Sequence, residues 1–373
     1  MTIMRPREKT VLFAKNFFLQ QELHGILDYA RAHGWQLEQP QMYGLREHVR
    51  DWRGAGLLTD TGFAVRELAA AGVQVVGLSL EPELLRHAHA VVSPDNHAIG
   101  AAAAEYFLVH GYRHFAVCAD CYGRDQAFAE RLAEAEFSAV RLPIPRYHRT
   151  PEALHDLAHA LKALPHPCAV FCNNDWEALS VLNAASLASL RIPETLSILG
   201  VGNEPSLCTT ARPQLSSLDT RLYERGRLAA EELDRLMEGA PPREAPLLVA
   251  PGAVVERGSS SAFATDDPAL RKMLDYLLLH YASPIQIADL AKRLHCGEST
   301  IYRHFMAAFR ISPKDFLTNL RFSRACTLLL DTDAPIATIA ANCGFASPTA
   351  LFALFQQRLH TTPDAWRRLK PKA

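Results

Sequence analysis

Three short polar segments of the sequence have residue types that could hold a small hydroxylated ligand: Ser93–Asn96, Cys172–Trp176 and Leu199–Glu204. Each follows a short apolar run that predicts a buried strand, so each lies where a strand ends. Asp and Asn side chains bond hydroxyl groups, and open α/β sheets bind ligands at the carboxyl ends of their strands. A turn or helix-capping role is about equally common for any one of these residues. Together they indicate a binding site for a polar small molecule.

A second group of polar residues lies in an internal repeat near the C-terminus. Ile287–Ala291 matches Ile336–Ala340 at an offset of 49 residues. Each copy has two apolar helical stripes separated by a short turn, which is the pattern of a helix-turn-helix. We therefore predict two such units, at about 287–309 and about 336–359. Three pairs predict helix starts in this region: Ser312-Pro313, Ser347-Pro348 and Thr362-Pro363.

Alternating strands and helices must position the first group of residues, between residue 10 and about residue 255. The apolar run Thr10–Ala14 predicts a strand, and apolar residues with helical spacing follow it. Gly34, Gly72 and Gly111 lie where helix C-caps are expected. About ten strands in this stretch predict two α/β lobes with parallel sheets, resembling Rossmann-type folds. The other predicted strands are Gly56–Thr59, Val73–Leu78, Ala90–Val92, Phe115–Cys118, Ala169–Phe171, Ile198–Val201, Leu247–Val249 and Val254–Val255.

Length and charge divide the chain in a consistent way. At roughly 100–200 residues per domain, 373 residues predict two or three domains. After about residue 257, Gly, Ser, Asp and Pro interrupt the alternation of strands and helices. We therefore place a sensing domain at 1–257, a linker at 258–267 and an all-helical domain at 268–373. The net charge of −1 divides into +7 for the helical domain and −8 for the remainder. The neutral total therefore conceals a basic domain, as expected of a domain that binds DNA.

Several functional classes have no support in the sequence. No apolar stretch is long enough for a signal peptide or a membrane span, so we expect a cytoplasmic protein with reduced thiols. Cys118 and Cys121 form a Cys-x-x-Cys pair, but no second pair completes a zinc site, and we expect no metal. The sequence lacks phosphate-binding loops, metalloprotease motifs and nucleophile elbows. We therefore expect no catalytic residues, no cofactor and no enzymatic activity.

The helical repeat resembles the double helix-turn-helix domain of the AraC/XylS family of transcriptional regulators. The residues that carry this resemblance are the repeated Ile-Ala, Gly344-Phe345-x-Ser347, Phe355 and Thr362-Pro363-x-x-Trp366-Arg367. The resemblance covers about 100 residues and implies that the second helix of each unit lies in a DNA major groove. The DNA-contacting residues that it implies are Glu298, Ser299, Thr300, Tyr302, Arg303, Ser347, Thr349 and Phe352.

Two departures from the family pattern suggest that the two units contribute unequally. Gly297 stands where a capping Ser is common, and Ala353 stands where a basic residue is common. Since the second unit offers few hydrogen-bonding groups, we expect the first to read most of the base sequence. Arg303 is the candidate for guanine and Glu298 for cytosine. We expect the second unit to contact thymine methyl groups and the DNA backbone.

Residues 10–257 resemble the two-lobed fold of LacI-type regulators and periplasmic sugar-binding proteins. The resemblance rests on the polar segments described above and on the run Pro193–Gly200. It implies an effector bound between the lobes. One departure bears on the ligand, because Gly202 stands where the family usually has an Asp. Trp176, Phe17, Phe18 or Trp35 could stack on a sugar face. The ligand-binding residues that the resemblance implies are Asn16, Asp60, Asp95, Arg124, Asp175 and Asn203.

Together, the two resemblances predict a transcription factor that is switched by a small molecule. They imply a homodimer that binds operator DNA, activates sugar catabolic genes and contacts RNA polymerase. The implied effector is a monosaccharide, for which a pentose such as xylose is the example. Three alternatives remain open at this point: a sugar- or nucleotide-processing α/β enzyme with an accessory helical domain, a regulator that senses a purine, and an architectural DNA-binding protein without an effector.

Overall fold

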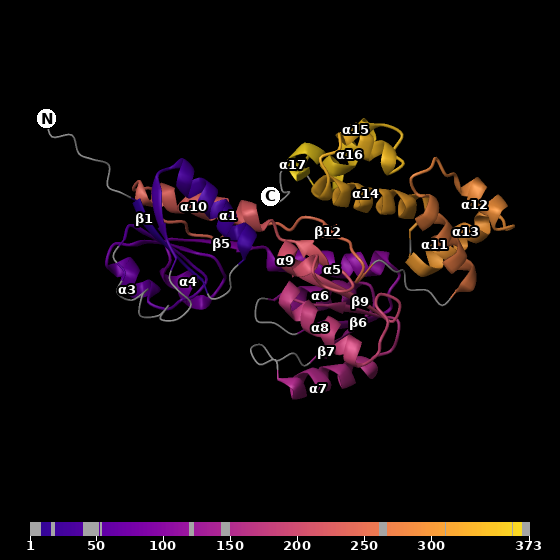
Figure 1. Cartoon of the computed structure of the whole chain (residues 1–373), viewed down its shortest axis with the longest axis horizontal. Helices are drawn as coiled ribbons and strands as arrows, with labels where there is room; N and C mark the ends of the chain where they lie inside the picture. Colours follow the sequence, from indigo (N-terminus) through magenta and orange to yellow (C-terminus); the bar gives the residue numbers. More distant parts are fainter. Residues whose placement is uncertain are drawn as a thin grey trace. The chain divides into compact units, whose positions relative to one another are not determined.

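The computed structural model describes residues 9–15, 19–39, 52, 54–118, 123–142, 150–260, 267–309, 311–359 and 361–367 (Figure 1). The chain forms two compact units. The first comprises Met1–Asp95 and Thr220–Pro251, and the second comprises Asn96–Asp219 and Gly252–Ala373. The chain therefore passes between the units three times, and each unit contains its own sheet. This arrangement confirms the predicted pair of α/β lobes.

The first unit contains a parallel six-stranded sheet in the order β11-β5-β4-β3-β1-β2 (Figure 1). Its central strands are fully buried, since their apolar side chains face helices on both sides. Its strands are β1 (Lys9–Ala14), β2 (Trp35–Glu38), β3 (Gly56–Thr59), β4 (Gln74–Gly77), β5 (Ala90–Pro94) and β11 (Leu247–Val249). Its helices are α1 (Gln20–Ala32), α3 (Val65–Ala70), α4 (Pro82–His87) and α10 (Leu222–Met237).

The second unit contains another six-stranded sheet, in the order β12-β10-β9-β8-β6-β7. All neighbours are parallel except β12, which runs antiparallel to β10 at one edge. The strands are β6 (His114–Cys118), β7 (Ala139–Leu142), β8 (Cys168–Phe171), β9 (Leu196–Gly202), β10 (Ser216–Asp219) and β12 (Val254–Val255). The helices around this sheet are α5 (Asn96–Val109), α6 (Arg124–Glu134), α7 (Pro151–Lys162), α8 (Asp175–Leu187) and α9 (Pro205–Cys208).

Three strands were not predicted from the sequence: β2, β7 and β10. The first two are short edge strands with polar residues, so they lack the continuous apolar run of a buried strand. In β10 the sequence Ser-Ser-Leu-Asp resembles a turn, yet all four residues are buried. The hydroxyl groups of Ser216 and Ser217 satisfy buried partners, which makes a polar central strand possible.

Helices α1 and α10 cross at two glycines in the first unit. A Cβ atom on Gly25 would lie 2.1 Å from the Tyr223 carbonyl oxygen, and a Cβ atom on Gly226 would lie 2.1 Å from that of Glu22. Only glycine therefore permits this close approach of the two backbones. The crossing also brings the side chains of Glu22 and Arg225 together inside the lobe.

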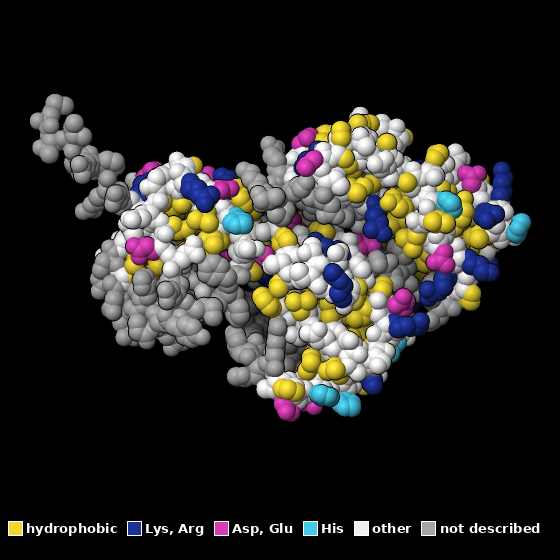
Figure 2. All heavy atoms as spheres, viewed as in Figure 1, with side chains coloured by type: hydrophobic (Ala, Val, Ile, Leu, Met, Phe, Trp, Pro, Cys, Tyr) yellow, Lys and Arg dark blue, Asp and Glu magenta, His cyan; other side chains and the backbone are white. Residues whose placement is uncertain are grey.

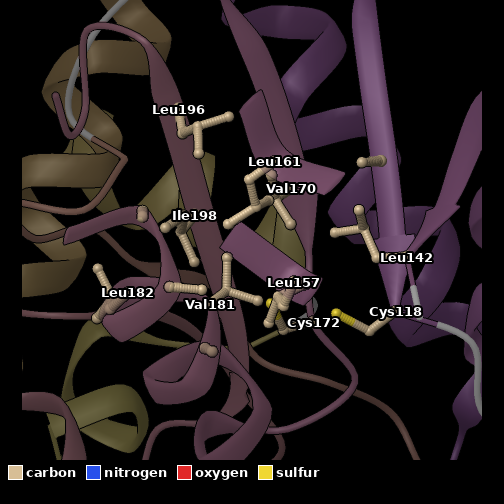
Figure 3. Packing of buried hydrophobic residues seen from close by; sticks show 14 of the residues in the cluster. Cys118, Leu142, Leu157, Leu161, Val170, Cys172, Val181, Leu182, Leu196 and Ile198 are labelled. Atoms are coloured by element: carbon tan, nitrogen blue, oxygen red, sulfur yellow. The ribbon is translucent and has the colours of Figure 1, made fainter. Parts of the chain in front are cut away.

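Three thiols that lie beside the sheet of the second unit, those of Cys118, Cys168 and Cys172, are packing groups. Figure 3 shows Cys118 and Cys172 among the buried aliphatic side chains of the largest core cluster. Burial raises the pKa of the Cys172 thiol, and it raises that of Cys168 to about 12. Protonated, buried thiols are poor nucleophiles and poor metal ligands. Cys121, the second half of the Cys-x-x-Cys pair, lies outside the described residues.

The C-terminal part of the second unit is helical, as predicted. Ser312, Ser347 and Thr362 cap helices through their side-chain oxygens, which confirms the three predicted helix starts. The buried apolar residues form one core around each helix-turn-helix unit. The helices are α11 (Pro268–His280), α12 (Ile287–Arg293), α13 (Glu298–Phe309), α14 (Pro313–Asp331), α15 (Ile336–Asn342), α16 (Pro348–Leu359) and α17 (Pro363–Arg367).

The first residues of the predicted linker 258–267 belong to the sheet of the second unit. The Ser259 hydroxyl donates to the Ile198 carbonyl at 2.7 Å and accepts from the Ser216 amide at 2.8 Å. Ser259 and Ser260 are fully buried. The linker prediction was therefore wrong for 258–260, because serine side chains here satisfy the backbone of a sheet edge instead of marking a flexible segment. Residues 261–266 lie outside the described residues.

No helix within the described ranges has the length and apolar character needed to cross a membrane.

Candidate functional site

Asp175 lies at the N-terminus of α8, directly after β8, where the sequence predicted a ligand-binding carboxylate. The side chain is 2 % exposed. Its oxygens accept hydrogen bonds from the Ser217 hydroxyl at 2.5 Å and from the Glu204 amide at 2.9 Å. Burial raises the pKa of Asp175, although these hydrogen bonds and the charge of Arg257 act in the opposite direction. Asp175 therefore fixes the loop after β9 from within.

Glycine at position 202, where the family usually has an Asp, has a structural reason. Gly202 has φ +126°, a left-handed value that side-chain-bearing residues rarely adopt. A Cβ atom there would also lie 3.2 Å from an oxygen of Asp175. A second carboxylate at this position would be strained and would face the Asp175 carboxylate.

Asn203, the next residue, is also held from within the second unit. Its amide donates to the Ser217 hydroxyl at 2.9 Å, and its side-chain oxygen accepts from Arg257 Nη2 at 2.9 Å. The backbone has φ 56°, which Asn tolerates better than most residues. The side chain is 9 % exposed, so Asn203, like Asp175, shapes the sheet edge.

Arg124 begins α6 and joins two of the polar segments. Its Nε donates to Asn96 Oδ1 at 2.8 Å, and its Nη1 donates to the carbonyl of Asn173. Arg124 is half-buried, and these two partners fix the position of its guanidinium. An Arg fixed in this way is suited to donate to ligand hydroxyl or ring oxygens.

Asn173 is a candidate that sequence reasoning missed, although it lies inside one of the polar segments singled out above. Its side-chain amide donates to the Cys118 carbonyl. Its Oδ1 is buried and finds no hydrogen-bond partner among the described residues. A buried acceptor beside Arg124 adds to the polar character of this edge of the sheet.

The remaining predicted ligand residues belong to the first unit. Asp60 follows β3 and accepts from the Ser79 hydroxyl through its carbonyl at 3.2 Å, and its side chain is partly buried. Asp95 follows β5 at the end of the first unit, and its amide donates to the Val249 carbonyl at 2.9 Å. Both lie at carboxyl ends of strands, as expected. Asn16 lies outside the described residues.

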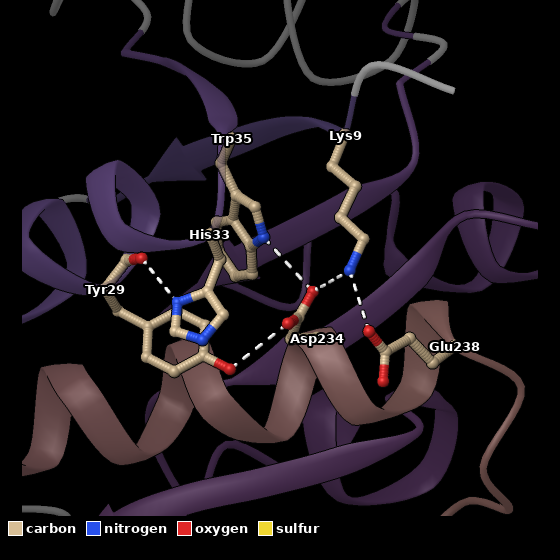
Figure 4. Close-up of polar contacts among 6 residues, drawn as sticks. All are labelled: Lys9, Tyr29, His33, Trp35, Asp234 and Glu238. Carbon is tan, nitrogen blue, oxygen red and sulfur yellow. Dashed lines mark hydrogen bonds and ion pairs between the residues drawn. The ribbon is translucent and has the colours of Figure 1, made fainter. Parts of the chain in front are cut away.

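Two of the candidate stacking residues lie in the described ranges and differ in exposure, whereas Phe17 and Phe18 lie outside the described residues. Trp176 is 44 % exposed at the start of α8. Trp35 is nearly buried, and Figure 4 shows why: its indole Nε1 donates to Asp234 at 3.1 Å, beside Lys9 and Tyr29. The expectation that Trp35 stacks on a sugar was therefore wrong, because the ring is part of the polar contact between α10 and the edge of the sheet. The carboxylate also contributes, after burial, to raising the pKa of Tyr29 to about 12.

Helix α13 presents a polar face in the first helix-turn-helix unit. Ile301, Phe305 and Phe309 are buried on its opposite face. Figure 2 shows Lys and Arg side chains over the part of the surface that carries α12 and α13. Thr300 is partly exposed, and the exposed residues of the helix include Glu298, Ser299, Tyr302, Arg303 and Met306.

The carboxylate of Asp267 connects α11 to α13. Asp267 caps α11 by accepting from the amides of Ala269 and Leu270, and the same carboxylate pairs with the His304 side chain. Desolvation acts to raise the pKa of Asp267, but the Leu270 amide and His304 outweigh it and lower the pKa. The exposed face of α13 is therefore presented by a fixed helix, as a base-reading helix requires.

Helix α16 of the second helix-turn-helix unit presents a less polar face. Ser347 is engaged as the cap, with its hydroxyl accepting from the Ala350 amide at 3.3 Å. Thr349 is exposed and Phe352 is half-buried. Arg358 lies 5.1 Å from the centre of the Phe322 ring and donates to Asn319 at 2.7 Å. The unequal contribution of the two helix-turn-helix units to base reading stays a prediction.

Comparison with known proteins matches both parts of the chain to family models. Residues 104–260 match the periplasmic binding protein-like domain, and residues 290–369 match a helix-turn-helix domain. The xylose operon regulatory protein of Escherichia coli K12 is 25 % identical over 380 residues, which cover 96 % of each chain. In both parts the chain is similar to AraC-type transcriptional regulators that carry a periplasmic-binding-protein-like domain.

Solved structures of regulators show the same fold as this chain. The structure of a xylose-binding transcription activator matches 99 % of this chain and all of that one, with a TM-score of 0.61 and 21 % identity. A LacI family regulator from Arthrobacter sp. FB24, in complex with lactose, matches 68 % of this chain with a TM-score of 0.59 and 22 % identity. The periplasmic-binding-protein-like body and the helix-turn-helix region thus occur in the predicted order, and the enzyme alternative is set aside.

Proposed function

We propose that this regulator activates genes of pentose catabolism in the cytoplasm and responds to xylose or a closely similar sugar. The observation that carries the proposal is the match to a xylose operon regulatory protein along 96 % of both chains, across sensor and DNA-binding region alike. Arg124, Trp176, Asp60, Asp95 and Asn16 are the proposed ligand contacts. Asp175 and Asn203 act on the ligand through the loop that they hold.

The effector is tested by titrating the full chain calorimetrically with D-xylose, other pentoses, hexoses and purine bases. We expect heat of binding with D-xylose and none with purines. Arg124→Ala should weaken binding at least about tenfold, because it removes a charged hydrogen-bond donor from the site. The matched control is Arg86→Ala, whose guanidinium pairs with Glu83 on the surface of the first unit. Binding of a purine alone would overturn the sugar proposal and favour a purine sensor.

The proposed regulator works as a homodimer on operator DNA. Two copies would offer four helix-turn-helix units, and units that enter successive major grooves on one face are separated by about 34 Å. The effector shifts the equilibrium only through a difference in its affinity for two conformations of the body. Once bound near a promoter, such a dimer can contact RNA polymerase.

Replacing Arg303 with alanine is expected to weaken operator binding by about 1–3 kcal/mol, or about 5–150-fold in Kd. Arg303 is exposed on α13, so its removal should leave folding intact while it relaxes base preference at one position. Fluorescence anisotropy at fixed salt, on a duplex enriched by the wild-type chain from a random library, measures the change. Arg86→Ala again serves as control. An unaltered Kd and an unaltered preference would remove Arg303 from the proposed interface.

A further inference from the structure

Strand β12 pairs with the strand through which the chain leaves the second unit. Val254 and Val255 pair with Leu218 and Ser217 of β10. The hydrogen-bond ladder between the two strands continues beyond β12. The Gly252 amide donates to the Asp219 carbonyl at 2.8 Å, and the Asp219 amide donates to the Ala253 carbonyl at 3.1 Å. Asp219 is the last residue of the second unit before the chain enters the first. A change in the crossing segment must therefore act on β12.

The other side of the same segment belongs to the core of the second helix-turn-helix unit. Val255 is buried in the apolar cluster that contains Phe322, Phe355 and Trp366. At Gly252 a Cβ atom would lie 2.8 Å from the Trp366 ring, so the backbone lies directly against the indole. One short segment thus completes both the sheet and the helical core.

Glu256, the residue after β12, adds a buried polar contact between the same two parts. Its carboxylate lies 3.7 Å from Nε2 of His110, the residue that follows α5, and the Ser323 hydroxyl of α14 donates to it at 3.5 Å. Burial acts to raise the pKa of Glu256, yet His110 and the charge of Arg324 outweigh it and lower the pKa. A buried carboxylate with partners on both sides is costly to separate from either of them.

The first helix-turn-helix unit has a different relation to the body. Within the described residues, its core cluster is built from residues 270–317 and includes no side chain from the α/β body. A hydrogen bond of 2.8 Å from the exposed Arg113 to the Ala307 carbonyl reaches α13. The second helix-turn-helix unit is therefore the one whose core includes part of the sensor.

We propose that residues 252–256 are the link that transmits the state of the sensor to the DNA-binding region, with Glu256 locking the turn after α5 to α14 through His110 and Ser323. The transmission step rests on the proposed effector function, whereas the lock itself does not. The second helix-turn-helix unit then serves chiefly to attach the DNA-binding region to the sensor. It orients the first helix-turn-helix unit, which reads the bases.

The test compares Glu256→Gln with the wild-type chain, using the full protein. Hydrogen–deuterium exchange measures the lock: in Glu256→Gln, the amides of 252–256 and α14 should exchange at least about tenfold faster, while those of α7 should not change. Anisotropy with and without D-xylose, on the library-enriched duplex, measures transmission. The wild-type ratio of the two Kd values, typically about 5–150-fold for such coupling, should fall to within about twofold of unity.

Two further variants make the outcome decisive. Ser323→Ala removes only the α14 partner of Glu256 and should also reduce the ratio of the two Kd values. This variant replaces Glu256→Gln as the test if Glu256→Gln disturbs folding. Glu134→Gln, at a carboxylate that is 70 % exposed, is the matched control and should behave as wild type. Unchanged exchange in Glu256→Gln and Ser323→Ala would overturn the lock. Faster exchange with a wild-type ratio would overturn transmission through this link. Faster exchange in a protein whose wild-type ratio is already unity would show that the proposed effector function has failed, and transmission with it, while the lock stands.

Discussion

Replacing Glu22 with glutamine is expected to destabilise the first unit by about 3–5 kcal/mol, because it leaves buried cations without their counter-charge. Glu22 is completely buried in α1 and pairs with both Lys15 and Arg225. Arg225 donates to one carboxylate oxygen from Nη2 at 2.6 Å and from Nε at 2.8 Å. Glutamine keeps the shape of the side chain but offers one acceptor oxygen and no charge.

Hydrogen exchange of the α1 and α10 amides measures this loss, since the slowest amides report the opening free energy of the lobe. The matched control is Glu83→Gln, which removes a half-exposed carboxylate paired with Arg86 at 2.7 Å. Exposed pairs contribute about 0–1 kcal/mol, so the control should stay close to wild type. A loss below about 1 kcal/mol in Glu22→Gln would show that the cations find other partners.

The same carboxylate gives a pH dependence with a definite sign. Burial acts to raise the pKa of Glu22, but Arg225 and Lys15 outweigh it, so the folded-state pKa lies below the ordinary value of 4.5. The stabilisation is therefore fully present above the unfolded pKa and is lost as pH falls through the lower folded pKa. In Glu22→Gln this part of the acid sensitivity of α1 and α10 should disappear, and an identical acid profile would contradict the assignment.

The sequence was sufficient to predict the two lobes and the paired helix-turn-helix units because both rest on periodic apolar patterns. Strands such as Thr10–Ala14 and stripes such as Ile301 and Phe305 report burial directly. The edge strands and β10 escaped because their burial depends on partners far away in the chain. Ser216 becomes a strand residue only because the carbonyl of Arg257 accepts its hydroxyl.

Residue roles at the candidate ligand site were less accessible to sequence reasoning. Asp175 and Arg124 both follow strands and both carry charge, so the sequence treats them alike. In the structure, Asp175 is buried and its oxygens accept from partners on β10 and in the loop after β9, whereas Arg124 is half-buried and donates to Asn96 and to the Asn173 carbonyl. Which polar group is structural depends on tertiary hydrogen bonds, and residue type and spacing do not encode these.

The boundary of the DNA-binding region shows the same limit. Composition placed the end of the sensing domain at residue 257 and the start of the DNA-binding region at residue 268, with a linker between them where Gly and Ser accumulate. Val255 and Gly252 nevertheless contribute to the core around Trp366, so a fragment that begins at 268 would lack part of its own hydrophobic core. A pattern of short-range residues cannot reveal that a two-residue strand serves two domains at once.

Replacing Trp366 with alanine is the second change with a large expected effect, a loss of about 3–5 kcal/mol from the core of the second helix-turn-helix unit. Trp366 is completely buried, packs 6.1 Å from the Phe355 ring between centroids, and donates from Nε1 to the Cys326 carbonyl at 3.2 Å. Alanine would open a cavity and leave that carbonyl without its donor. Hydrogen exchange of α14 to α17 measures the loss.

Trp366→Phe is the graded control, since it retains most of the volume and removes only the indole donor, and it should cost clearly less than alanine. Because the core of the first helix-turn-helix unit is separate, the amides of α11 to α13 should keep their protection from hydrogen exchange in Trp366→Ala. The variant then separates the two roles assigned to the helix-turn-helix units: base preference at the Arg303 position should persist, while overall affinity and the response to the sugar decline. Loss of protection across α11 to α13 as well would mean that the two helix-turn-helix units fold as one. The two units could then not have the separate roles proposed for them.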